Sequence, residues 1–98
     1  MSKEEHKRFR QIGHALKPIV SIGSKGLTDA VASEVNRALN DHELIKIKLP
    51  NEDRETLIQE LSEHVSFELI QLIGNVALIY RQATNANPKL SNLLRHTP

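Results

Sequence analysis

A short loop is the feature of this chain whose residue types most directly suggest chemistry. Gly23-Ser24-Lys25-Gly26 places a lysine between two glycines, after a β-branched run and ahead of a helical pattern. Glycines let a backbone approach a phosphate closely and present N–H groups, and the lysine adds positive charge. The pattern indicates a clamp for the backbone of single-stranded nucleic acid. It fits equally a tight turn in which a glycine takes positive φ, and the residues alone leave both interpretations open.

A row of cations near the start of the chain is the second such feature. Its members recur at spacings of 4, 3, 4 and 3 residues: Lys3, Lys7, Arg10, His14 and Lys17. On a helix these positions fall within a stripe roughly 80° wide, opposite the apolar residues Phe9, Ile12 and Leu16. Solvated helix faces usually mix both signs of charge, whereas this cationic stripe contains no acid. It is either a binding face for a polyanion or an ordinary solvated face.

Charge is distributed unevenly along the 98 residues. Residues 1–25 contain six Lys or Arg and two Glu, a net charge of +4. Residues 26–80 contain four Lys or Arg and ten acids, and residues 81–98 add three cations and no acid. The overall charge of +1 is therefore the sum of segments with opposite charges, and the basic N-terminal segment contains both the loop and the cationic stripe. We expect one side of the molecule to suit a polyanion.

The sequence lacks the residues that several other kinds of chemistry require. The absence of cysteine excludes disulfides, thiolate nucleophiles and Cys-ligated zinc, and it favours a cytoplasmic location. The five histidines show no metal-binding spacing, and the glycine loop matches neither a Walker loop nor a dinucleotide fingerprint. We therefore expect no enzymatic activity, metal, cofactor or small-molecule substrate. Only three residues are aromatic, and their core-type positions argue against a platform on which bases stack.

Composition excludes further classes of protein. Apolar residues make up 39% of the chain and charged residues 26%, which is ordinary for a globular domain. The longest apolar runs fall far short of the roughly 18–20 residues that span a bilayer. The N-terminal segment lacks the apolar core of a secretory signal, and its early glutamates argue against a transit peptide. We expect no membrane partner.

Hydropathy patterns predict the elements that position the loop and the cationic stripe. Helical periodicity indicates helices over about 2–15, 29–40 and 52–64, with Thr28 and Asn51 as the N-caps of the second and third. β-branched or alternating runs predict strands at 18–22, 44–49, 67–73 and 76–81. The last two strands flank Gly74-Asn75, which predicts a β-hairpin. In the strand 44–49, the alternation predicts that Lys46 and Lys48 face solvent.

This α-β-α-β-α-β-β order predicts one α/β domain of the two-layer α+β type, with a mixed four-stranded sheet. The domain is expected to occupy residues 1–82. Residues 83–98 form a C-terminal tail, in which Leu90, Leu93 and Leu94 either dock onto the body or lie loose.

The motifs resemble those of a known family, the CRM domain (chloroplast RNA splicing and ribosome maturation). The resemblance covers about residues 2–82, and its motifs are Lys17-Pro18-Ile19-Val20, Ile22-Gly23-Ser24-Lys25-Gly26-Leu27-Thr28, His42-Glu43-Leu44-Ile45-Lys46-Ile47-Lys48, Asp53-Arg54 and Leu78-Ile79-Tyr80-Arg81. A single domain of this kind is similar to the free-standing bacterial YhbY-type member.

The resemblance implies a fold like the C-terminal domain of translation initiation factor three. It also implies binding to ribosomal RNA in precursors of the large (50S) subunit, with Gly23, Ser24, Lys25 and Gly26 as the RNA-contacting loop. We therefore expect a cytoplasmic, monomeric RNA-binding protein that acts in ribosome assembly. The alternative is a protein-interaction adaptor without direct RNA binding, which would use the acidic middle of the chain or the outer face of the hairpin.

Overall fold

Seven secondary-structure elements follow one another in the predicted order. The computed structural model describes residues 2–84 and 90–93. Its elements are α1 (Lys3–His14), β1 (Pro18–Ser21), α2 (Asp29–His42), β2 (Leu44–Lys48), α3 (Arg54–His64), β3 (Glu68–Ile73) and β4 (Val76–Tyr80). Three helices and a mixed four-stranded sheet make an α+β fold, so the predicted fold class is confirmed.

The sheet has the strand order β1-β2-β4-β3. β1 runs parallel to β2, and β4 runs antiparallel to both β2 and β3. The predicted hairpin is confirmed: β3 and β4 meet at Gly74, whose φ of 57° suits glycine. The register places Ser21 beside Lys48 and Lys48 beside Val76, so one row of residues crosses β1, β2 and β4.

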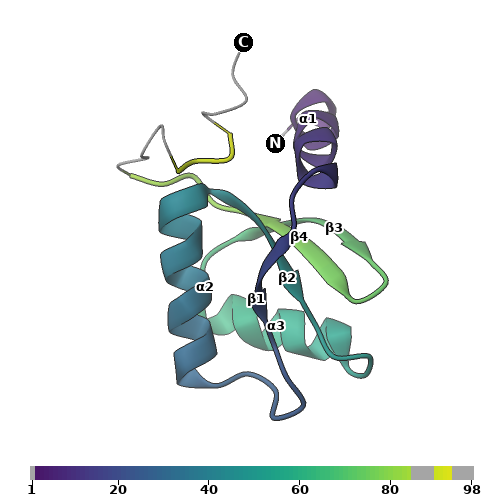
Figure 1. Ribbon diagram of the computed structural model, residues 1–98, viewed down its shortest axis with the longest axis vertical. Helices are drawn as coiled ribbons and strands as arrows, with labels where there is room; N and C mark the ends of the chain where they lie inside the picture. The colour runs from purple at the N-terminus through teal and green to yellow at the C-terminus, as the bar shows by residue number, and fades with distance from the viewer. Residues whose placement is uncertain (1, 85–89, 94–98) are drawn as a thin grey trace.

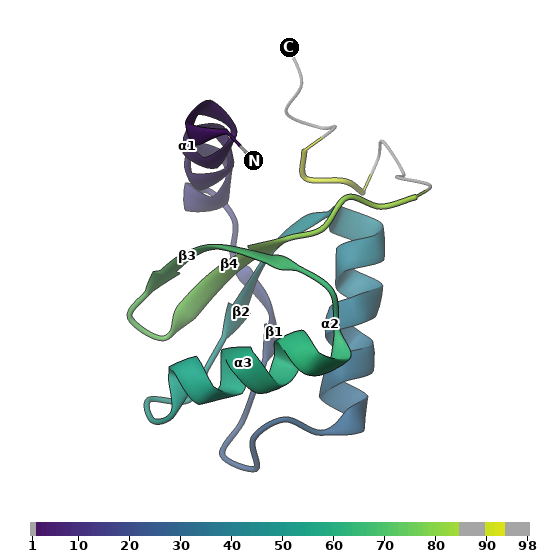
Figure 2. The same ribbon diagram turned by 180° about the vertical axis from the view of Figure 1, so that it is seen from behind.

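α2 and α3 cover one face of the sheet (Figures 1 and 2). Val35 and Leu39 of α2 and Leu61 of α3 are fully buried against Ile45 and Ile47 of β2. Twelve buried residues join in this cluster, which we call the main core. The predicted alternation of β2 is confirmed on this face, since Ile45 and Ile47 are buried whereas Lys46 and Lys48, which alternate with them, are not.

α1 lies against the opposite face, near one end of the sheet (Figure 2). Phe9 and Ile12 pack there with Leu44, Ile70 and Leu78, in a cluster that we call the small core. The alternating pattern of β2 does not predict that Leu44 is buried, because a helix distant in sequence covers it. α1 also comes close to the sheet at Gly13, where an added Cβ would lie 2.5 Å from a methyl group of Leu78.

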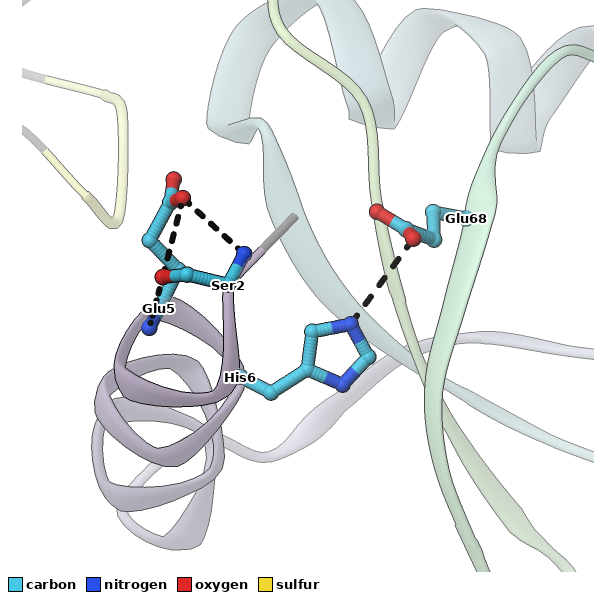
Figure 3. A network of polar contacts seen from close by, with 4 residues as sticks. All are labelled: Ser2, Glu5, His6 and Glu68. Carbon is cyan, nitrogen blue, oxygen red and sulfur yellow. Dashed lines mark hydrogen bonds and ion pairs between the residues drawn. The ribbon is translucent and has the colours of Figure 1, made fainter.

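The first turn of α1 is fixed by its own side chains (Figure 3). The Ser2 hydroxyl accepts from the Glu5 N–H at 3.1 Å, and the Glu5 carboxylate accepts from the Ser2 N–H at 3.2 Å. This capping box lowers the pKa of Glu5, first through the Ser2 backbone and then through its side chain. His6 lies 3.7 Å from Glu68 of β3, which adds a contact between α1 and the sheet.

The predicted start of α3 is wrong. Asn51 is not its N-cap: Asp53 occupies that position with φ 57°, and no side chain caps the helix. The chain leaves β2 through Pro50 and turns over Asn51 to Asp53, so Asn51 lies too far upstream to reach the first helical N–H groups. Its side chain instead accepts from the Asn75 amide at 3.4 Å. The other predicted cap is confirmed, since the Thr28 hydroxyl accepts from the Val31 N–H at 3.2 Å.

Two arginines of the family-like motifs hold elements together. Arg81, just after β4, donates to the side-chain oxygens of Asn36 and Asn40 at 2.8 and 2.9 Å and so ties α2 to the sheet. Arg54, at the start of α3, donates to the Gly74 carbonyl at the hairpin turn. The hairpin turn is therefore fixed beside the start of α3.

Part of the C-terminal tail packs on the domain. Leu93 is 8% exposed and belongs to the small core, whereas Leu90 is 39% exposed. The Ser91 hydroxyl donates to the buried Glu43 carboxylate at 2.7 Å. Leu94 lies outside the described residues. None of the helices in the described part of the chain is long and apolar enough to cross a membrane.

Candidate nucleic-acid interface

The Gly23–Gly26 segment forms a tight turn between β1 and α2. The Gly26 N–H donates to the Gly23 carbonyl at 3.0 Å, and Gly26 has φ 76°. A side chain at Gly26 would therefore be strained, so the turn itself requires glycine at this position. Gly23 is different, because its φ is not positive and a Cβ there would meet no atom within 4 Å. The fold gives no reason for glycine at position 23.

The first three residues of the loop expose backbone donors. Gly23, Ser24 and Lys25 are exposed, and their N–H groups donate no hydrogen bond to any residue that the structure describes. Consecutive N–H groups in a turn form a concavity that binds anions. The lysine side chain adds a charge at the same place. The geometry of the loop is therefore compatible with a phosphate ligand as well as with a turn.

The loop stands apart from the N-terminus of α2. Leu27 and Thr28 separate Gly26 from Asp29, the first helical residue, and Thr28 caps the helix itself. The order of strand, loop and helix in the sequence suggests that the positive end of this helix contributes directly to the loop. In the structure two residues intervene between the loop and the helix, and the loop also exposes N–H groups of its own.

The cationic stripe is exposed along its whole length. Lys3, Lys7, Arg10 and His14 lie on α1, and Lys17 follows the end of that helix. Within residues 2–84 and 90–93, the one contact between a basic and an acidic side chain joins His6 to Glu68, so no acid lies within ion-pair distance of the cationic stripe there. Unpaired cations on one side of a helix give a local positive potential.

The structure does not merge the loop and the cationic stripe into one cluster. They lie at opposite ends of β1, which runs from α1 to the loop (Figure 1). At about 3.3 Å per strand residue, the stretch from Lys17 to Gly23 spans roughly 20 Å. A ligand that touches both must therefore be extended and must follow β1.

Two cations of β2 lie beside this route, although the strand pattern predicts only that they face solvent. Lys46 donates to the Leu16 carbonyl at 3.1 Å, which places its charge at the C-terminal end of α1. Lys48 is exposed and pairs with Ser21, two residues before the loop. Alternation along the strand shows that both point outward, but only the pairing of β1 with β2 places them next to the loop and the cationic stripe.

The aromatic residues do not form a stacking surface. Phe9 and Tyr80 pack together with ring centroids 4.7 Å apart, and Phe67 is partly buried against the main core. Burial raises the pKa of Tyr80, with the Glu43 charge as the next contribution. This surface therefore offers hydrogen-bonding groups and charge rather than aromatic rings on which bases could stack.

The sequence matches the family model of the CRS1 / YhbY (CRM) domain over residues 1–81. A probable RNA-binding protein of Pseudomonas aeruginosa is 45% identical over 98 residues, covering 97% of this chain and 94% of that protein. An RNA-binding protein of Haemophilus influenzae is 34% identical over 93 residues, covering 92% of this chain and 94% of that protein. A probable RNA-binding protein of Bacillus subtilis is 34% identical over 83 residues, with coverage of 81% and 86%.

A solved structure has the same fold. The solution structure of a hypothetical protein from Staphylococcus aureus superposes with a TM-score of 0.72 at 28% identity, covering 87% of this chain and 92% of that chain. The family match covers all seven elements, including the loop and the cationic stripe. The chain therefore belongs to the CRS1/YhbY (CRM) domain family, as its motifs predicted.

Proposed function

We propose that this protein binds single-stranded RNA through the Gly23–Gly26 loop and the cationic stripe of α1. The observation that carries the proposal is the loop itself: three N–H groups that donate to no described residue, a lysine, and a glycine at position 23 that the fold does not require. The names of the relatives, which are RNA-binding proteins, support the same ligand.

The mechanism is a backbone clamp. A phosphate of the RNA lies on the N–H groups of the loop, close to Gly23, where a side chain would obstruct it. Lys25 neutralises part of its charge. Lys7, Arg10 and Lys17 contact further phosphates along the strand, each contact releasing a bound counterion. Such binding recognises the backbone and the shape of a single strand more than its base sequence.

The finer target that we propose is ribosomal RNA in precursors of the large subunit, with a role in ribosome assembly. This part of the proposal rests on the resemblance to the YhbY-type members of the family. Crosslinking in cells, followed by sequencing of the attached RNA, tests it. Enrichment of large-subunit precursor RNA is the expected result, and enrichment of messenger RNA alone would contradict it.

We propose binding without catalysis. In the described part of the chain, no three His, Asp or Glu side chains gather as metal ligands would. The adaptor alternative would need an exposed apolar patch. The exposed large apolar residues in the described part of the chain are Ile19 on β1, Leu69 and Ile73 on β3, and Leu90 in the tail. Because β1 and β3 are opposite edges of the sheet, Ile19 cannot join Leu69 and Ile73, and these two residues alone make a small patch, so the observations favour RNA.

Substitution of Gly23 tests the clamp more cleanly than substitution of Gly26, where positive φ would also strain the fold. Gly23→Asp places a carboxylate where the phosphate should lie, and we expect it to abolish binding in a folded protein. Ser33→Asp, on the exposed surface of α2, is the control with the same change of charge. Lys25→Ala should cost about 1 kcal/mol of binding free energy. If Gly23→Asp binds RNA like the parent, the loop is a turn and nothing more.

A further inference from the structure

Two hollows flank the loop, and they differ in charge. One, of about 420 Å³, lies between the loop and the start of α3, and its lining includes Glu52, Asp53 and Glu60. The other, of about 540 Å³, lies between the loop and the hairpin turn, and its lining combines Lys48 and polar residues with Ile22, Leu49 and Pro50 and includes no acid. An extended polyanion that is bound to the loop can continue into either of these two hollows. Electrostatics favours the second hollow, which we call the Lys48 hollow.

Lys48 stands in the Lys48 hollow as an unpaired cation. It follows Ile47, which is fully buried in the main core, so its own side chain points to the other face of the sheet. It is exposed and makes no ion pair or side-chain hydrogen bond with any described residue. Its backbone is fixed beside the loop, because the Ile22 N–H donates to the Lys48 carbonyl at 2.8 Å.

The far wall of the Lys48 hollow is built from two amides. The Asn75 side chain donates to the Asn51 side-chain oxygen at 3.4 Å, and the Asn75 carbonyl accepts from the Leu49 N–H at 2.7 Å. Both asparagines retain donor and acceptor capacity toward the Lys48 hollow. Amide side chains of this kind bind the edges of unstacked bases in single-stranded RNA. No aromatic residue lines the Lys48 hollow, so a base there would be held by its edge.

The acid-free surface continues from the Lys48 hollow toward α1. The next hollow along β1, of about 230 Å³, is lined by Lys17, Ile19 and Lys46 and again contains no acid. It ends at the last residue of the cationic stripe. β1 and β2 contain no acid between these two hollows, so the outer side of the two strands carries no negative side chain of its own from the loop to Lys17.

We propose that the nucleotide adjacent to the clamped phosphate occupies the Lys48 hollow, with Lys48 on its phosphate and Asn51 and Asn75 on its base or sugar. The strand then crosses β1 and β2 toward Lys17. This inference rests on the proposed function and adds to it a second subsite, its chemical class and the path of the RNA. It assigns a binding role to three residues outside the loop and the cationic stripe.

Affinity for a short single-stranded RNA oligonucleotide, measured by fluorescence anisotropy, tests the subsite. We expect Lys48→Gln to weaken binding about fivefold and to reduce the salt slope by about 0.7, and Lys48→Glu to weaken it more than about tenfold. The Asn51→Ala, Asn75→Ala double variant should weaken binding about threefold to tenfold without changing the salt slope. Arg37→Gln, a cation on the exposed surface of α2, is the matched control and should bind like the parent. Equal thermal melting curves show that the variants are folded.

A photo-crosslinking amino acid placed in turn at two positions tests the path. Asn75 lines the Lys48 hollow alone of the two, and Thr56 lines only the acid-lined hollow, which adjoins it at Ser24, Pro50 and Asn51. Crosslinks to RNA from position 75 and none from position 56 are expected. If Lys48→Glu binds normally while Gly23→Asp does not, the clamp stands and the subsite is wrong. If crosslinks form only from position 56, the path is wrong. Failure of the parent to bind RNA would overturn the proposed function and the subsite together.

Discussion

The two faces of the sheet are built differently. On the face that α2 and α3 cover, twelve buried residues form the main core, and Val35, Leu39, Ile47, Leu61 and Ile79 are completely inaccessible. On the opposite face, six buried residues form the small core beneath α1, and β2 carries Lys46 and the exposed Lys48. The hydrophobic effect scales with buried apolar area, so most of the folding free energy comes from the first face.

Because of this difference, stability and the proposed RNA binding depend on different faces of the sheet in a chain of 98 residues. The face that contributes most to stability contains no proposed RNA contact. The proposed contacts lie on the loop, on α1, at Lys48 on the outer side of β2, and at Asn51 and Asn75 in the two neighbouring turns. Substitutions on the two faces should therefore change different measurements.

The largest expected effect on stability comes from the main core. Leu39 is fully buried in α2, and Leu39→Ala removes its packing and leaves a cavity. We expect a loss of about 3 kcal/mol in the free energy of unfolding. Urea denaturation followed by circular dichroism measures it. A loss below about 1 kcal/mol would show that the main core can collapse around the gap or that stability resides elsewhere.

A smaller effect is expected from the small core. Leu93→Ala shortens a side chain at the margin of the structure, where Arg8 also donates to the Leu93 carbonyl at 3.5 Å. We expect a loss of about 1–2 kcal/mol, less than for Leu39→Ala because fewer groups surround the side chain. The same denaturation experiment compares the two variants directly. Equal losses would contradict the division between main and small core.

Removal of charge from α1 should leave stability almost unchanged. Lys7, Arg10 and Lys17 are exposed and have no acidic partner in the described part of the chain. Changing all three to Gln is expected to alter the free energy of unfolding by less than about 0.5 kcal/mol. RNA binding should weaken, with a salt slope smaller by about 2. If the triple variant binds RNA normally, the cationic stripe is only a solvated face.

The smallest expected effect is a shift in one titration. Burial beside Phe9 raises the pKa of Tyr80 above its ordinary value of 10.0, so the folded state favours the neutral phenol. This contribution to stability is complete below pH 10.0 and is lost as the pH rises through the folded-state pKa. Tyr80 is the only tyrosine and the chain has no tryptophan, so absorbance follows it directly. Phe9→Ala should move the midpoint toward 10.0, and an unchanged midpoint would show that α1 does not shield the phenol.

Local patterns in the sequence predicted most of this fold. Gly74-Asn75 specifies a hairpin, Thr28 caps α2, and the spacing of Phe9 and Ile12 gives the buried side of α1, because each depends on nearby residues only. Leu44 and Lys48 show what local patterns miss. Leu44 is buried because α1 and Leu93 pack over it, and Lys48 lies beside the loop because β1 pairs with β2.

The candidate site also contains residues that local spacing predicts and residues that only the folded structure brings together. The residues of the loop and of the cationic stripe are close together in the sequence, so local spacing is enough to identify them. Residue spacing does not predict that Asp53, in the left-handed conformation, is the N-cap of α3. No residue type between Pro50 and Asp53 indicates that the helix begins after Asp53 rather than after Asn51. The Lys48 hollow brings Lys48 of β2 and Asn51 of the following turn together with Asn75 of the hairpin turn, and only the pairing of β2 with β4 makes Asn75 their neighbour.

The salt dependence of RNA affinity is the most direct test of the central claim that this protein binds RNA through phosphate contacts. Five lysines or arginines of the loop and the cationic stripe, with His14, should give a plot of log K against log[salt] a slope of about −4 for a single strand. Titrations of a labelled single-stranded RNA at several salt concentrations measure this slope. A steep negative slope that Lys25→Ala reduces by about 0.7 is the predicted result. A slope near zero, or no measurable binding at low salt, would contradict the claim.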